Sequence, residues 1–479
     1  MRYAFKKLLF LGFFISFFLG SNALPTDIKG IAVGGNGMVI RLTTFADRIS
    51  FEEKILAISE IDAKGNFKLD FDLDAIQEVF LKIGNQSFAF FAEAGKSTEL
   101  KIEQIEIPPR SVLSEQKRLQ VLWTSGNALN EALDNFNFTL SAFLEKNFIA
   151  LYKYRDSKLL QDFALEIDTK LKNTSSLNAE ERLYFKQHIA YQLADLKRAA
   201  RTNSDLVLGN TYFKNEKVLY NQPNYITFFQ HYFNQYFLSG KRNTNYNEIV
   251  ALIQSGANTQ KLLDYLGQDP ILEQARLREF VLLFALKEIY YSKDFKQEQI
   301  RNLIKEIANK SSFVEHKNTA LAMLDQLTRL QVGSSAPNIN FTAANSSSLA
   351  DYKGYYVYLA FVSENCPACE VDLKRIAQLA EKYKSDIAFI ELYVNYTKEG
   401  LTAFAKQSNS AIHQFSFNQD FELLNQYKVR TFPSYFLIDR EGKILLNQSQ
   451  KPDENLARYF DFLIKRDRDK TKKKETLFR

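Results

Sequence analysis

The stretch SENCPACEVDLKR, residues 363–375, holds both cysteines of a chain of 479 residues, Cys366 and Cys369. A disulfide between them would close a minimal loop, and the stability that a disulfide adds grows with the length of the loop it closes. Chemistry therefore explains the pair better than stability does. An inert structural disulfide stays open as the alternative.

The residues on either side of the pair predict a strand followed by a helix. The preceding run, YYVYLAFV at 355–362, is continuously apolar and β-branched, which is typical of a buried central strand. After the cysteines an amphipathic helix is expected to about Lys384. Its apolar face would consist of Leu373, Ile376, Ala377 and Ala380.

A cysteine at the start of a helix has a physical reason to be reactive. Unpaired backbone N–H groups and the helix macrodipole favour an anion there, and the thiolate is the attacking species in disulfide exchange. Cys366 is therefore expected to attack a substrate disulfide. Cys369, one helical turn further on, is expected to resolve the mixed disulfide. Pro367 between them is tolerated in the first turn, where its missing N–H costs little.

Metal binding is a weaker interpretation of the same residues. A structural zinc site needs about four ligands, and a copper carrier would want a histidine beside the cysteines. The four histidines of the chain are scattered, at His188, His231, His316 and His413. We therefore expect no metal and no cofactor.

The residues that follow predict an α/β layer fold. DIAFIELYVN at 386–395 is a second buried strand. TFPSYFLID at 431–439, the turn REGK and the run ILLNQ predict a hairpin, and 453–465 predicts a closing helix. The order strand, helix, strand, helix, hairpin, helix is that of a layered α/β domain.

Residues 332–465 resemble the thioredoxin fold, specifically the TlpA-like exported thiol–disulfide oxidoreductases. The pieces that carry the resemblance are GSSAP at 333–337, LADYKGYYVYLAF at 349–361, CPAC at 366–369 and VRTFPSYFLIDREGKI at 429–444. The resemblance covers less than a third of the chain, but its motifs stand in order with the right elements between them. The gap between Cys369 and Pro433 leaves room for the extra βα unit of the TlpA-like branch.

The resemblance implies roles for three further residues. Pro433 corresponds to a cis-proline that faces the two cysteines, and Phe432 before it would present its backbone to an incoming peptide. Asp372 corresponds to an acidic residue found three positions after the second cysteine in cytochrome-maturation members. It would lie one turn from Cys369, close enough to influence proton transfer. An exposed helix carboxylate without such a role is the alternative.

Three positions depart from the thioredoxin pattern. Asn365 stands where thioredoxins usually have tryptophan, and Ala360 stands where they keep a buried aspartate. Phe432 is a bulky residue before the proline. Each can change substrate choice or redox poise, so neither property is carried over from the family.

The N-terminus has the layout of a secretory signal peptide over residues 1–23. Basic residues precede an apolar run of about twelve residues at 8–19, which is short of the roughly 20 that a spanning helix needs. Ser21-Asn22-Ala23 then supplies small residues for cleavage. An uncleaved anchor is the alternative.

Loss of residues 1–23 would lower the net charge from +6 to +3. That charge is too mild to indicate nucleic-acid binding.

The whole chain is predicted to be a multidomain α+β protein: an N-terminal antiparallel β domain, a central α-helical region and a C-terminal thioredoxin-like α/β domain. The expected ranges are a signal peptide at 1–23, a β-sandwich-like accessory domain at 24–108, helices at 109–331, the thioredoxin-like domain at 332–465 and a basic tail at 466–479. An aromatic stripe at helical spacing is interpreted as packing rather than as a ligand groove. It comprises Phe228, Tyr232, Phe233 and Tyr236.

The leading functional hypothesis is an exported disulfide reductase of the periplasm or cell envelope. Its partners would be disulfide- or thiol-bearing envelope proteins and a membrane electron donor or acceptor, with no nucleic acid. An oxidase or isomerase on the same fold is an alternative, because sequence does not set the redox potential. A peroxidase is disfavoured, since Ser363 stands where its threonine would be. A non-catalytic envelope scaffold is the alternative from another class. The front part loosely resembles accessory or substrate-docking regions of exported Bacteroidetes proteins.

Overall fold

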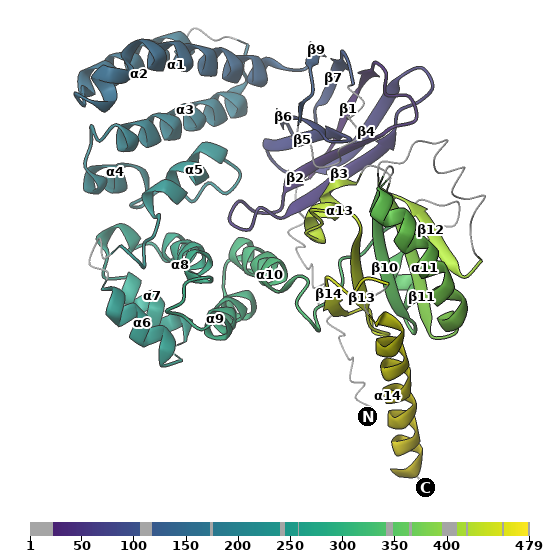
Figure 1. The fold of residues 1–479 in the computed structure, drawn as a ribbon. Helices are drawn as coiled ribbons and strands as arrows, with labels where there is room; N and C mark the ends of the chain where they lie inside the picture. Colours follow the sequence, from purple (N-terminus) through teal and green to yellow (C-terminus); the bar gives the residue numbers. More distant parts are fainter. Residues whose placement is uncertain are drawn as a thin grey trace, which may run out of the picture.

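The computed structural model shows three parts that follow one another along the chain (Figure 1). It describes residues 23–105, 117–172, 176–239, 245–256, 258–341, 348–363, 366–394, 410–417, 420–452 and 455–477. The predicted signal peptide, apart from Ala23, and the departure at Asn365 lie outside these ranges. Within them, no helix is both long and apolar enough to cross a bilayer.

The first part is a sandwich of two β-sheets. Its strands are β1 (Leu24–Ala32), β2 (Val39–Phe45), β3 (Glu53–Glu60), β4 (Asn66–Leu73), β5 (Gln77–Ile83), β6 (Gln86–Ala92), β7 (Ser97–Ile102), β8 (Lys117–Arg118) and β9 (Val121–Ser125). One sheet has the order β4-β1-β7-β9 and the other β3-β2-β5-β6-β8. Most pairs are antiparallel, as expected, but β1–β7 and β6–β8 are parallel. Inward side chains alternate with exposed ones, most regularly along β4, and form one core between the sheets.

The strands continue beyond the boundary expected at residue 108. β9 pairs with β7 in one sheet, and β8 pairs with β6 in the other. Trp123 on β9 packs against the rings of Phe88 and Phe90, which ties the late strand to the sandwich core. The helices therefore begin only at Ala128.

The second part is a curved helical arm that runs from the sandwich to the third part (Figure 1). Its helices are α1 (Ala128–Tyr152), α2 (Ser157–Lys172), α3 (Ala179–Ala199), α4 (Asp205–Tyr212), α5 (Pro223–Tyr232), α6 (Tyr246–Gln254), α7 (Thr259–Leu266), η1 (Pro270–Leu272), α8 (Ala275–Ile289), α9 (Gln297–Lys310) and α10 (Val314–Thr328). The aromatic stripe of α5 and the turn after it is buried in the largest core of this arm, which confirms the packing interpretation.

The third part is a five-stranded sheet with helices on its faces, as predicted. Its elements are η2 (Leu349–Tyr352), β10 (Tyr356–Ser363), α11 (Pro367–Tyr383), β11 (Ile387–Val394), β12 (Ile412–Ser416), α13 (Phe421–Gln426), β13 (Ser434–Ile438), β14 (Ile444–Asn447) and α14 (Leu456–Leu477). The strand order is β12-β11-β10-β13-β14. β10 runs parallel to β11 and antiparallel to β13. Both β10 and β11 are buried along their full length, which explains their continuous apolar sequences.

The closing helix α14 is longer than the segment 453–465 expected for it. It continues to Leu477, through the range that we expected to be a solvated tail. That range contains neither glycine nor proline and is rich in lysine and arginine, which have high helix propensity. Asp467 also anchors it, because its carboxylate accepts hydrogen bonds from the Tyr356 hydroxyl at 2.6 Å and from Arg440 Nε at 3.0 Å.

The loop between β2 and β3 joins the sandwich to the helical arm. Ile49 at its tip is fully buried in the core of the arm. Lys287 on α8 donates a hydrogen bond to the Ile49 carbonyl, and Gln230 on α5 donates to the Arg48 carbonyl at 2.9 Å. The Asp47 carboxylate accepts from the Ser50 N–H at 2.6 Å and so braces the loop from within.

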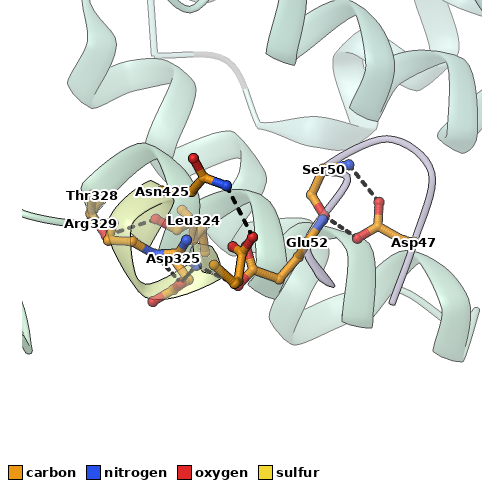
Figure 2. A network of polar contacts seen from close by, with 9 residues as sticks. Asp47, Ser50, Glu52, Leu324, Asp325, Thr328, Arg329 and Asn425 are labelled. Atoms are coloured by element: carbon orange, nitrogen blue, oxygen red, sulfur yellow. Dashed lines mark hydrogen bonds and ion pairs between the residues drawn. The ribbon is translucent and has the colours of Figure 1, made fainter. Parts of the chain in front are cut away.

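All three parts meet beside this loop, as Figure 2 shows. Arg329, at the end of α10, forms ion pairs with Glu52 of the sandwich at 2.6 Å and with Asp325 of its own helix. Asn425 on α13 of the third part lies next to them and donates to Glu422 at 3.4 Å. α13 of the third part therefore lies at the place where the sandwich and the helical arm meet.

Glu422 carries a pH-dependent contribution to the stability of this junction. Burial raises the pKa of Glu422 to about 7, the carboxylates of Glu53 and Glu52 add to the rise, and Asn425 and Lys82 oppose it. The folded chain therefore holds this proton more tightly than the unfolded chain, in which the ordinary pKa is 4.5. The resulting contribution to stability is greatest below pH 4.5 and is lost as the pH rises to about 7.

We expect Glu422→Gln to remove this part of the pH dependence, because an amide cannot ionise. Thermal unfolding midpoints measured from about pH 4.5 to 8 should fall less steeply in Glu422→Gln than in the natural protein. Glu441→Gln, at an exposed position of the same part, is the control and should keep the natural slope. Equal slopes in Glu422→Gln and the natural protein would contradict the assignment.

Candidate active site

The two cysteines lie where β10 ends and α11 begins. Cys366 is the N-cap of α11, Pro367 is the first helical residue, and the N–H of Cys369 donates to Cys366 Sγ at 3.1 Å. The sulfurs are joined in a disulfide, with the two Cα atoms 5.2 Å apart. Cys369 is fully buried, whereas Cys366 is only partly covered. One sulfur of the pair can therefore be approached from outside and the other is shielded.

Pro433 lies at the same end of the sheet as the cysteines. The Phe432–Pro433 peptide bond is cis. β13 begins at the next residue, Ser434, which pairs with Phe361 near the end of β10. Because β10 and β13 are antiparallel, the start of one strand and the end of the other come together there. Phe432 packs against the core that contains Cys369.

Asp372 is buried on the inner face of α11, so the interpretation as an exposed helix carboxylate is wrong. The residue is 7 % exposed. Oδ2 accepts a hydrogen bond from the Tyr435 hydroxyl at 2.7 Å, and Oδ1 lies 3.5 Å from Nη1 of Arg375. A buried carboxylate requires such partners, because burial without them is costly.

Tyr435 is a site residue that sequence reasoning missed. It stands two positions after Pro433 on β13, and side chains two apart point to the same face of a strand. That face packs against α11, which carries both Cys369 and Asp372. The period of two, counted from the proline, is the signal that could have found Tyr435.

A second buried carboxylate, that of Glu391, lies on the same face of the sheet. Glu391 accepts hydrogen bonds from the Tyr393 hydroxyl and from Gln414 Nε2, the latter at 3.0 Å. Burial raises its pKa above the ordinary value. In register it pairs with Ala360, which in turn pairs with Tyr435. A single glutamate in the otherwise apolar run of β11 was the sequence signal for it.

These features define a thioredoxin-fold domain with a dithiol site at a strand–helix junction. In the described ranges, no three His, Cys, Asp or Glu side chains gather in a way that could hold a metal ion. The disulfide, the accessible sulfur at a helix N-terminus and the neighbouring proline together suit thiol–disulfide exchange.

The sequence relatives of this domain belong to the same class. Residues 332–446 match the AhpC/TSA family. The thiol-disulfide oxidoreductase ResA of Geobacillus kaustophilus is 30 % identical over 120 residues, which cover 24 % of this chain and 68 % of that protein. ResA of Bacillus thuringiensis subsp. konkukian is 28 % identical over 135 residues, 27 % of this chain and 78 % of that protein. A solved thiol:disulfide interchange protein from Bacteroides sp. is 24 % identical and covers 29 % of this chain and 90 % of that one, with a TM-score of 0.25.

The chain belongs to the TlpA-like thiol–disulfide oxidoreductases through this C-terminal domain. These matches cover between 24 % and 29 % of the whole chain. The sandwich and the helical arm therefore lie outside the part that the relatives share.

Tyr435→Phe tests how much the buried hydrogen bond to Asp372 stabilises the domain. Removing the hydroxyl takes away the 2.7 Å hydrogen bond to Oδ2 of this buried carboxylate, so we expect a loss of about 1–3 kcal/mol in the free energy of unfolding. Denaturant unfolding measures it. Tyr355→Phe is the control, because Tyr355 is exposed and should change stability by less than about 0.5 kcal/mol. Losses of equal size in the two variants would count against the contact.

Proposed function

We propose that the protein is an exported disulfide reductase that exchanges disulfides with proteins of the periplasm or cell envelope through Cys366 and Cys369. The single observation that carries the proposal is the pairing of an accessible and a buried cysteine at a helix N-terminus beside a cis-proline. The reducing direction is that of the TlpA-like type. Export rests on the layout of residues 1–23.

The proposed reaction moves two electrons from the dithiol to a substrate disulfide. The Cys366 thiolate attacks one substrate sulfur, so that a Cys366–substrate disulfide forms and the other substrate sulfur leaves as a thiolate. Cys369 then loses its proton and attacks Cys366 Sγ. The Cys366–Cys369 disulfide forms, and the second substrate thiolate is released. A membrane electron donor would return the pair to the dithiol state.

Phe432 and Pro433 would position the substrate during this exchange. They precede β13 at the end of the sheet where the cysteines lie. A substrate chain that passes beside them in extended form can hydrogen-bond to the exposed backbone as an added strand. Such pairing would hold the substrate disulfide close to Cys366.

Asp372 would manage the proton of Cys369. The second half-reaction requires that a buried thiol lose its proton, and burial disfavours the thiolate. A carboxylate buried one helical turn away can accept that proton within the protein. The hydrogen bond from Tyr435 would hold the carboxylate on the inner face of α11.

Asp372→Asn should slow resolution of the mixed disulfide while initial attack by Cys366 continues. General acid–base groups contribute about 10²–10⁴-fold, so we expect a loss of at least about tenfold in the resolution rate near neutral pH. Stopped-flow kinetics with a fluorescent mixed disulfide would measure both steps. A pH profile of resolution that is identical in Asp372→Asn and the natural protein would rule out the role.

The reduction potential of the Cys366–Cys369 pair tests the direction of electron flow. Equilibration in defined thiol buffers should give a value of about −270 mV, as for a reductant of the thioredoxin kind. A value of about −120 mV would show instead that the pair makes disulfides, as an oxidase does.

Trapping separates redox chemistry from a scaffold role. In Cys369→Ser the resolving sulfur is missing, so mixed disulfides with envelope proteins should accumulate on Cys366. Cys366→Ser should trap none, and serves as the matched control. A cell that carries Cys366→Ala and behaves like one with the natural protein would overturn the redox proposal and favour a non-catalytic envelope scaffold.

A further inference from the structure

A groove of about 730 Å³ separates the sandwich from the thioredoxin-like part. One wall is the outer face of the β3-β2-β5-β6 sheet, with Arg41, Ile55 and Lys82. The other wall is α13 and the segment after it, to Arg430. Figure 1 shows α13 next to β2 and β3 at this place. The volume is within the roughly 300–1,000 Å³ of typical binding clefts.

One wall of the groove ends, along the chain, just before the segment that carries Pro433. Arg430, on its wall, stands three residues before Pro433, a span of at most about 11 Å of chain. Beyond that point lie the cis peptide bond and the start of β13, at the end of the sheet that carries the cysteines. A smaller cavity shares part of this lining, and its wall includes Glu52 and Arg329. Figure 2 shows these two residues within their polar network.

The lining of the groove excludes a polyanion and suits a polypeptide. Its ionisable residues are of both kinds, with three basic and three acidic side chains: Arg41, Lys82, Arg430, Glu53, Asp420 and Glu422. A surface for nucleic acid or phosphate would be uniformly positive. Carboxamides line both walls, and each offers a donor and an acceptor as a peptide group does. They are Asn85, Asn338, Asn340, Asn425 and Gln426.

We propose that this groove binds the polypeptide segment that flanks the reacting cysteine of a substrate protein. The inference rests on the proposed thiol–disulfide exchange at Cys366 and adds a second, extended contact to it. The sandwich is then part of the substrate site, since it supplies one whole wall. Apolar side chains such as those of Ile55 and Phe80 contact the segment, and the carboxamides pair with its backbone.

Peptide disulfides of increasing length test the groove in the full-length, reduced protein. Each probe is a single cysteine joined to 5-thio-2-nitrobenzoate, with no flanking residues or with about four or eight randomised residues on each side. Attack by Cys366 on the peptide sulfur releases the coloured thiolate. We expect the second-order rate constant to rise about tenfold from the shortest probe to the longest.

Ile55→Glu on the sandwich wall should abolish the rise of the rate constant with probe length, because a buried charge opposes binding of a peptide. Its rate with the shortest probe should stay within about twofold of the natural protein, which also shows that the redox site is folded. Ile31→Glu is the matched control. Ile31 and Ile55 are both strand isoleucines with 47 % exposure, but Ile31 lies on β1 of the other sheet. It should keep the full rise.

The outcomes separate the two proposals. A rate that does not depend on probe length in the natural protein, or an equal rise in Ile55→Glu, overturns the groove while the exchange reaction stands. A reduced protein that reacts with no probe at all overturns the exchange function and the groove with it.

Discussion

The pairing of β10 with β13 is the constraint on which the candidate site depends. β10 is buried along its whole length, so its position in the sheet is determined by packing on both faces. Cys366 follows the C-terminal end of β10. The antiparallel β13 begins at the same end of the sheet, directly after Pro433. The segments that carry Cys366 and Pro433 are more than sixty residues apart in the chain, and the pairing of these two strands brings them together. The fold does not require a direct contact between the cysteines and the proline.

The polar groups behind the site follow the same sheet. Asp372 is satisfied by Tyr435, and Glu391 by Tyr393 and Gln414. Burial of a carboxylate costs free energy unless hydrogen bonds compensate. Each of these groups therefore depends on a neighbouring strand, and the site is coupled to strand register. A shift of β13 by one residue would turn Tyr435 to the opposite face and remove its hydrogen bond to Asp372.

The sandwich and the helical arm are joined to each other by a small number of specific contacts. Ile49 inserts from the sandwich into the core of the arm, and Arg329 joins the end of the arm to Glu52. The same region holds α13, the helix that precedes Pro433. The outer face of the β3-β2-β5-β6 sheet and α13 line one groove, so the front part of the chain lies next to the helix that precedes Pro433.

The sequence by itself determined what depends on local pattern. Continuous apolar runs predicted β10 and β11, helical spacing predicted α11, and the cysteine spacing together with the proline motif identified the class of site. The tertiary structure alone decided what depends on contacts between distant residues. These are the late strands β8 and β9 in the sandwich, the burial of Asp372 by Tyr435, Glu391 on the same face, and the groove between β2, β3 and α13. Local propensity carries no information about which surfaces meet, because that depends on packing of the whole chain.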